Sequence, residues 1–169
     1  MAGSLEIERK FLVRGTDWGP PRSTTDIAQG YLMLAPDRSL RIRRKGDRYI
    51  LTFKAAAGGG GARHEFEYEV PPADGQAMLA RLCTEAPIEK RRHDVEHAGL
   101  LWEIDVFTGA NAGLIVAEVE LDAPDAPVTL PPWAGPEVTD DPRFYNANLY
   151  THPFTRWGVD YSGLLTELA

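Results

Sequence analysis

Charged and apolar residues alternate along several stretches of the sequence, and the first of these is LEIERKFLV at residues 5–13. In an extended strand successive side chains point to opposite faces, so Glu6, Glu8 and Lys10 would share one face. Carboxylate oxygens are ligands for Mg²⁺ or Mn²⁺, and a lysine ammonium binds phosphate as a point charge. A half-solvated strand of an antiparallel sheet explains one isolated stretch more simply, so the other strands have to decide.

The same alternation gives the later strand-like stretches an ionic face, on which bases and acids are grouped separately. The bases are Arg41, Arg43, Lys45, Lys54, Lys90 and Arg92, and the acids are Glu65, Glu67, Glu69, Glu103, Asp105, Glu118 and Glu120. Facing ionised groups must pair, hold water or bind a charged ligand, because an unpaired buried charge is costly. Several forked and point-charge donors suit the oxygens of a polyphosphate, and the acids suit a divalent metal. The pattern therefore predicts a site for a compact, metal-bound polyanion.

Eight strand-like segments would position these side chains. They cover residues 5–14, 27–34, 39–45, 48–54, 63–70, 88–97, 100–107 and 114–122. Short turn-like connections such as Gly46-Asp47 suit antiparallel hairpins. With eight strands, a closed sheet leaves an interior just wide enough for side chains or one small ligand. We therefore expect an α+β protein, mainly antiparallel β, whose sheet closes into an eight-stranded barrel over about residues 5–122 with its ionic face inward.

Helices and loops surround this predicted barrel. The Pro-Pro pair at residues 71–72 begins one helix, in which apolar residues recur at spacings of three and four. A second helix begins at Asp141, which we expect to cap it. Segments 15–25 and 123–136 are rich in Pro, Gly and small polar residues, which is typical of surface loops. Because two helices cover only part of the outward apolar face, we also expect a homodimer.

Length, charge and cysteine content limit the class of protein. The chain of 169 residues fits one domain, 1–169, in which a C-terminal helical segment at about 141–169 follows the barrel. The formal net charge of −7 argues against non-specific binding to nucleic acid. The single cysteine, Cys83, excludes a disulfide framework, and no apolar run approaches the ~18 residues of a membrane span. We expect a cytoplasmic protein without nucleic-acid or membrane partners.

Other motifs do not point to a different chemistry. The glycines at 58–61 lack the Gly-Lys-Ser/Thr of a phosphate-binding loop, the histidines lack metal-ligand spacing, and there is no Gly-x-Ser-x-Gly nucleophile motif. Metal-activated water is therefore the expected attacking group. The four tryptophans, Trp18, Trp102, Trp133 and Trp157, are interpreted as packing residues.

In their order along the chain, these motifs resemble those of the CYTH superfamily, also called triphosphate tunnel metalloenzymes. The series begins with the Glu-x-Glu-x-Lys signature at Glu6, Glu8 and Lys10 and continues through QGYL, LRIR, TFK, EFEYE, EKRR, WEID, AEVE and DDPRFYNANL, over roughly residues 5–150. The ordered series, more than the signature alone, carries the resemblance. It implies an eight-stranded antiparallel tunnel barrel with a charged interior, in agreement with the strand count.

The resemblance also implies a role for each group of charged residues. Triphosphate-binding roles fall on Lys10, Arg41, Arg43, Lys54, Lys90 and Arg92, and among these Lys10, Lys90 and Arg92 are expected to be catalytic. Metal-binding roles fall on Glu6, Glu8, Asp105, Glu118 and Glu120, while Glu65, Glu67 and Glu103 are expected to be partners of the bases. The expected cofactor is Mg²⁺ or Mn²⁺, in a two-metal site.

Within this family, the short single domain with EIERKFLV, QGYL and RFYNANL is most similar to the bacterial enzymes that hydrolyse inorganic tripolyphosphate to pyrophosphate and phosphate. The resemblance therefore implies a metal-dependent triphosphatase, with nucleoside triphosphates as further substrates to test. Thiamine triphosphatase, class IV adenylate cyclase and a non-catalytic module that binds polyphosphate or a nucleotide are the alternatives. The sequence shows neither an adenine site nor an aromatic clamp for thiamine, so inorganic triphosphatase ranks first.

Overall fold

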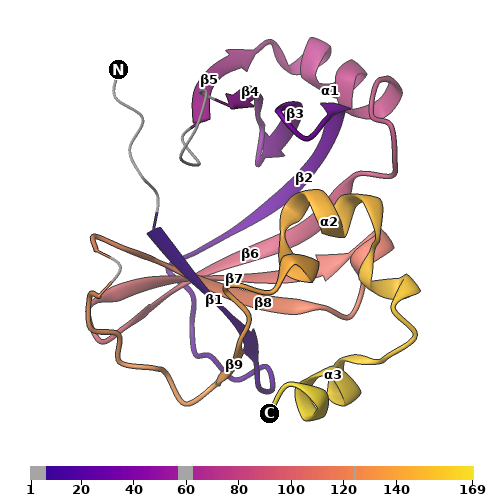
Figure 1. Ribbon diagram of the computed structural model, residues 1–169. Helices are drawn as coiled ribbons and strands as arrows, with labels where there is room; N and C mark the ends of the chain where they lie inside the picture. The colour runs from indigo at the N-terminus through magenta and orange to yellow at the C-terminus, as the bar shows by residue number, and fades with distance from the viewer. Residues whose placement is uncertain (1–6, 57–62, 124) are drawn as a thin grey trace.

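The computed structural model describes residues 7–56, 63–123 and 125–169 (Figure 1). Its strands are β1 (Ile7–Val13), β2 (Ser23–Leu34), β3 (Arg38–Lys45), β4 (Arg48–Ala56), β5 (Arg63–Val70), β6 (Ile88–His97), β7 (Leu100–Thr108), β8 (Ile115–Leu121) and β9 (Ala134–Glu137). Its helices are α1 (Pro72–Arg81), α2 (Asn146–Thr151) and α3 (Tyr161–Glu167), with 3₁₀ turns at η1 (Gly109–Asn111), η2 (Pro142–Phe144) and η3 (Phe154–Arg156). All eight predicted strands are present.

The strands form one antiparallel sheet in the order β5-β4-β3-β2-β6-β7-β8-β1-β9, which confirms the predicted fold class. Two details differ from the prediction. The sheet has a ninth strand, in a segment expected to be loop, and within the described ranges no backbone pairing joins β5 to β9, so hydrogen bonds do not close the barrel. Strand β9 pairs with β1 at Phe11 and Val13, where it takes up part of the edge that a closing strand would need.

The sheet bends so that two arms lie on either side of its interior. Figure 1 shows β3, β4 and β5 with α1 on one side, and β1, β6, β7 and β8 on the other. The long strand β2 connects the arms, because it pairs with β3 along one edge and with β6 along the other. A single sheet therefore supplies two facing walls.

The outer face of one arm is an apolar cluster. Phe11, Trp102 and Val119 are its central members, and all are almost completely buried. The indole of Trp102 packs edge-on against that of Trp133, with ring centroids 5.4 Å apart, so the segment before β9 covers this face. The packing role predicted for both tryptophans is confirmed. Part of the apolar surface that suggested a dimer is thus covered by the chain itself.

The inner face of the same arm changes from charged to apolar towards one end of the sheet. On each of four strands, an apolar residue lies two positions from a charged residue of the inner face. These apolar residues are Leu12 (from Lys10), Val116 (from Glu118), Ile88 (from Lys90) and Phe107 (from Asp105). The strand register brings all four to the same end of the sheet. They pack against Phe144, Leu149 and Leu164 of the C-terminal segment. This segment closes one end of the interior, which the alternation of charges along the strands did not predict.

Helix α1 packs on the outer face of the other arm, and two glycines permit its close approach. A Cβ on Gly75 of α1 would overlap the side chain of Tyr49 on β4. A Cβ on Gly30 of β2 would likewise overlap Cys83, which follows the helix. Glycine is therefore required at both contacts, and α1 holds the arm that carries Arg41 and Arg43.

The C-terminal segment begins as predicted but is more divided than expected. The carboxylate of Asp141 accepts a hydrogen bond from the backbone N–H of Arg143, which confirms the predicted cap. Tyr145 is extended and separates the turn η2 from α2, so the expected single helix is two short pieces. A further helix, α3, was not predicted separately and is capped by Asp160. None of the helices in the described part of the chain is long and apolar enough to cross a membrane.

Candidate functional site

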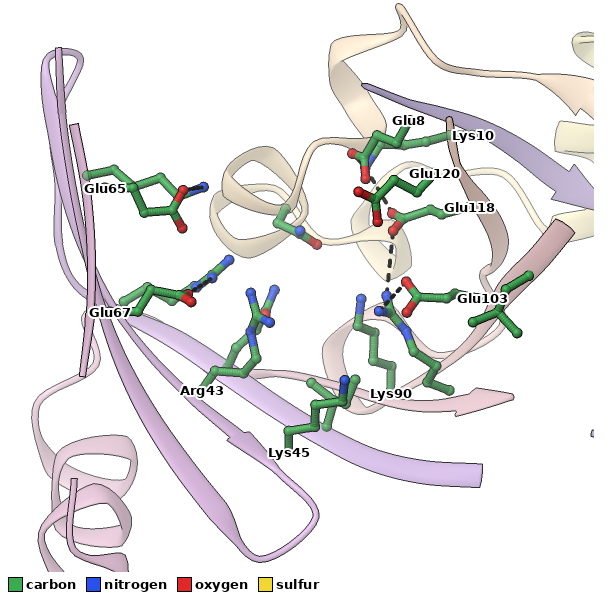
Figure 2. A pocket seen from close by; sticks show the side chains of 17 residues that line it. Glu8, Lys10, Arg43, Lys45, Glu65, Glu67, Lys90, Glu103, Glu118 and Glu120 are labelled. Atoms are coloured by element: carbon green, nitrogen blue, oxygen red, sulfur yellow. Dashed lines mark hydrogen bonds and ion pairs between the residues drawn. The ribbon is translucent and has the colours of Figure 1, made fainter. Parts of the chain in front are cut away.

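A cavity of about 460 Å³ lies between the two arms (Figure 2). Of the predicted site residues that the structure describes, all but Asp105 line this cavity: Glu8, Lys10, Arg41, Arg43, Lys54, Glu65, Glu67, Lys90, Arg92, Glu103, Glu118 and Glu120. Glu6 lies outside the described residues. The alternation along separate strands therefore brings the predicted residues to one place.

On one side of the cavity lies what we call the ion-pair wall: Lys10, Lys90, Arg92, Glu103, Asp105 and Glu118, from β1, β6, β7 and β8. Lys10 stands opposite Glu118 in the strand register, and its Nζ lies 2.9 Å from Glu118 Oε1 and 2.9 Å from Glu8 Oε1. Burial would lower the pKa of the Lys10 ammonium, but the carboxylates of Glu118 and Glu8 outweigh it and raise the pKa above its ordinary value. Lys10 is therefore a charged, paired base.

Asp105 is the most buried member of this wall, with 1% of its surface exposed. Its carboxylate accepts hydrogen bonds from Lys90 Nζ at 2.5 Å and from Arg92 Nε and Nη2 at 2.7 Å each. Burial would raise the pKa of Asp105, but these two cations hold it below its ordinary value. Since both oxygens are already engaged beneath the cavity, the geometry favours a role in positioning Lys90 and Arg92 over the predicted metal ligation.

Arg92 connects several carboxylates of the ion-pair wall. Besides Asp105 it contacts Glu103 at 2.5 Å and Glu118 at 3.5 Å. Burial raises the pKa of Glu103 and outweighs the attraction of Arg92, while the nearby acids Asp105 and Glu118 act in the same direction as burial. The acids of this wall therefore repel one another, and the neighbouring cations offset that repulsion.

The opposite side is the arginine wall, which consists of Gln29, Arg41, Arg43 and Lys54 on β2, β3 and β4. Arg41 is 8% exposed, yet its contacts to Thr52 Oγ1 and Glu67 Oε1 are long, at 3.4 Å and 4.0 Å. Arg43 forms no ion pair with any residue that the structure describes. Burial, followed by repulsion from Arg41, lowers the pKa of Arg43 to about 10, so its guanidinium stays charged at neutral pH.

Five other residues of the cavity lining had not been assigned a site role: the apolar Ile27 and Leu101, and the polar Gln29, Lys45 and Asn146. Lys45 lies on the predicted ionic face of β3. Gln29 stands opposite Arg43 in the register of β2 and β3, but it is uncharged, so the pattern of charges along the strands does not indicate it. Asn146 comes from the start of α2, and no local sequence pattern shows that the C-terminal segment reaches the cavity.

The acids of β1, β7 and β8 fit a hard divalent cation by their chemistry. Glu8 stands directly opposite Glu120, and Glu103 directly opposite Glu118, in the strand registers. Like charges opposite each other in a sheet destabilise it unless a cation lies between them. The described residues contain no group of three or more acids, histidines or cysteines already arranged to hold a metal. Two of these carboxylates, those of Glu8 and Glu118, are paired with Lys10. The acids therefore suit a divalent metal chemically, but they are not yet arranged around one.

Comparisons with known proteins agree with this geometry. The CYTH domain family matches residues 4–145 of the chain. An inorganic triphosphatase of Acetivibrio thermocellus is 40% identical over 149 residues, which cover 88% of this chain and 95% of that protein. An inorganic triphosphatase of Nitrosomonas europaea is 37% identical over 148 residues, which cover 85% of this chain and 95% of that protein.

Solved structures show the same likeness. The crystal structure of an inorganic triphosphatase has a TM-score of 0.71 at 34% identity and covers 88% of this chain and 95% of its own. A putative adenylyl cyclase from Hippeastrum has a TM-score of 0.53 at 15% identity over 72% of this chain and 81% of its own, which shows a shared fold alone. With the family match over most of its length and two relatives above a third identical, the chain belongs to the CYTH domain family.

Proposed function

We propose that this protein hydrolyses inorganic tripolyphosphate to pyrophosphate and phosphate. The observation that carries the proposal is the arginine wall, where the buried Arg41 and the half-buried Arg43 and Lys54 face a cavity without an equal number of acceptors. A compact polyanion supplies the missing acceptors. Both relatives are inorganic triphosphatases, which supports tripolyphosphate as that polyanion.

The two walls would divide the work on the substrate. Arg41, Arg43 and Lys54 would bind phosphoryl oxygens by forked and point-charge contacts. Lys10, Lys90 and Arg92 lie across the cavity, where the carboxylates around them fix their positions. Phosphoryl transfer is promoted mainly by positioning and by neutralising charge in the transition state, and preorganised cations supply both.

Metal dependence is general among CYTH triphosphatases, and we propose Mg²⁺ or Mn²⁺ as the metal here, with two ions per site. Glu8, Glu118 and Glu120 are the described residues that would hold it, and Glu6 is predicted to join them. When bound, such a metal neutralises phosphate oxygens and lowers the pKa of a water that attacks phosphorus. The protein's own bases then keep the triphosphate in line for that attack.

The test is phosphate release from tripolyphosphate, ATP and thiamine triphosphate, measured side by side with Mg²⁺ and with Mn²⁺. We expect tripolyphosphate to be the best substrate and excess chelator to abolish turnover. Faster turnover of thiamine triphosphate or cyclic AMP formation from ATP would favour an alternative enzyme. Tight binding of tripolyphosphate without any turnover would indicate a binding module, and undiminished turnover in chelator would remove the metal mechanism.

Replacement of one proposed metal ligand tests the same proposal. Glu8→Gln should lower the rate of tripolyphosphate hydrolysis by at least ~100-fold, as expected when an electrostatic contributor to the transition state is lost. The matched control is Glu137→Gln, which removes a carboxylate paired with Arg9 and does not line the cavity. The control should retain its activity. A mild effect of Glu8→Gln would favour a merely half-solvated strand.

We also propose that the chain forms a homodimer and acts in the cytoplasm. On the outer face of β5, Phe66 and Tyr68 remain 49% and 61% exposed, and Leu82 beyond α1 is 56% exposed. Large apolar side chains that stay exposed are candidates for an interaction surface. Light scattering at micromolar concentrations should give twice the mass of the chain, and a monomer would reject the proposal.

A further inference from the structure

Three buried side-chain donors lack an acceptor in the cavity wall. Among the described residues, five buried polar side-chain atoms have no hydrogen-bond partner, and three of them are Gln29 Nε2, Arg41 Nε and Arg43 Nε. All three are N–H donors, and all three residues line the same cavity from the adjacent strands β2 and β3. What this part of the cavity lacks is therefore an acceptor.

Gln29 occupies the strand that joins the two walls. It stands opposite Arg43 of β3 on one side and opposite Ile88 of β6 on the other, two residues from Lys90. Only 2% of its surface is exposed. Leaving a buried amide N–H without an acceptor costs the full desolvation of that group, so Gln29 contributes nothing to the fold through this atom.

Asn111 shows what a structural amide looks like in the same protein. It is 1% exposed, but its Nδ2 donates to the Leu149 carbonyl at 3.2 Å and its Oδ1 accepts from the Phe154 N–H at 2.8 Å. These bonds attach η1 to the C-terminal segment. Gln29 has the same burial and the same chemistry but no such bond from its amide nitrogen.

We propose that Gln29 is a further substrate-binding residue, whose side-chain amide donates a hydrogen bond to a phosphoryl oxygen of the triphosphate held by Arg41 and Arg43. The assignment rests on the proposed function. A neutral donor suits this position, because a third cation beside two neighbouring guanidinium groups would add repulsion in the empty site. The amide adds a directed contact and leaves the charge unchanged.

The experiment compares Gln29→Leu with Asn111→Leu as a matched control. Affinity for tripolyphosphate is measured by calorimetry in EDTA, where hydrolysis is prevented, and kcat and KM are measured with Mg²⁺. Gln29→Leu should melt at the same temperature as the wild type or higher, because an unsatisfied buried donor is removed. Its affinity should fall roughly tenfold to a hundredfold, the range for a lost hydrogen bond to a charged group. Asn111→Leu should melt lower and bind tripolyphosphate as the wild type does.

Gln29→Glu is the second variant, and it guards against an effect of side-chain shape. It keeps the length of the side chain but replaces the donor by a negative charge, so it should weaken tripolyphosphate binding more than Gln29→Leu does.

A Gln29→Leu protein that melts lower and keeps wild-type affinity and KM would overturn the assignment and make Gln29 structural. If the wild type itself neither binds nor hydrolyses tripolyphosphate, the proposed function fails and the Gln29 assignment fails with it. If the wild type does both and the Gln29 variants are unchanged, the assignment alone fails.

Discussion

The ion-pair wall and the arginine wall contain equally buried bases but balance them differently. Lys10, Lys90 and Arg41 are 7%, 6% and 8% exposed. Yet Lys10 and Lys90 each have a carboxylate oxygen at 2.9 Å or closer, whereas the nearest carboxylate to Arg41 is 4.0 Å away. In the ion-pair wall, the bases are neutralised by carboxylates of the protein itself. In the arginine wall, positive charge remains available to bind an anionic ligand.

This difference predicts opposite effects of mutation on stability and binding. Removing one partner of a buried ion pair strands the other charge and strongly destabilises the fold. Removing a buried cation that has no partner relieves a desolvation cost, so the fold is unharmed while the ligand is bound less well. Stability measurements on the free protein and affinity measurements together therefore distinguish the walls.

The largest effect on stability is expected at the centre of the ion-pair wall. Asp105→Asn leaves Lys90 and Arg92 without their shared carboxylate, which should cost about 3–5 kcal/mol of unfolding free energy. For a chain of this size that corresponds to a melting temperature lower by roughly 6–20 °C. Chemical and thermal denaturation measure it. Asp26→Asn, which breaks the exposed pair with Arg91, is the control and should leave the stability nearly unchanged, because water screens an exposed pair. Equal losses in both variants would contradict the distinction.

The next effect concerns substrate affinity on the arginine wall. Arg41→Lys preserves the charge of the cavity but loses the planar fork, so KM for tripolyphosphate should rise roughly tenfold. The melting temperature should stay near the wild-type value, because the contacts of Arg41 to Thr52 and Glu67 are long. Steady-state kinetics and thermal denaturation are measured on the same variant. A protein that melts several degrees lower and keeps its kinetic constants would show that Arg41 belongs to a structural ion network.

A smaller effect should appear when the folded protein is titrated with acid. Burial would raise the pKa of Asp105, but Lys90 and Arg92 hold it below the ordinary 3.8. The stabilisation is therefore complete above pH 3.8 and is lost as the pH falls through the lower folded value. Because Asp105→Asn lacks this titration, its melting temperature should fall less than that of the wild type between about pH 5 and about pH 3. Parallel curves for the two proteins would argue against a charged Asp105.

The smallest effect is expected at the rim of the arginine wall. Lys54 and Glu65 form a partly exposed pair at 3.3 Å. Such pairs contribute about 0–1 kcal/mol, so Glu65→Gln should leave the melting temperature nearly unchanged. It should lower KM for tripolyphosphate slightly, since Lys54 is freed for the anion. A clear rise in KM would instead place Glu65 among the groups that the bound substrate needs.

The sequence predicted which side chains share the cavity but not how they pair. Alternation along a strand fixes the face of a residue, so Glu8, Arg43 and Glu118 could be placed inward from local pattern alone. The pairing of Lys90 with Asp105 depends on the register between β6 and β7 and on their depth below the surface, which no single strand encodes. The ninth strand and the apolar end of the interior depend likewise on contacts with segments distant in the chain.

We expect the triphosphate to bind first to the arginine wall and not to the ion-pair wall. A crystal structure of the protein with tripolyphosphate in the presence of chelator tests it directly. We predict phosphoryl oxygens within hydrogen-bond distance of Arg41 and Arg43, with the contacts from Asp105 to Lys90 and Arg92 unchanged. A triphosphate held by Lys90 and Arg92 after separation from Asp105, with Arg41 and Arg43 turned to Glu65 and Glu67, would contradict the claim.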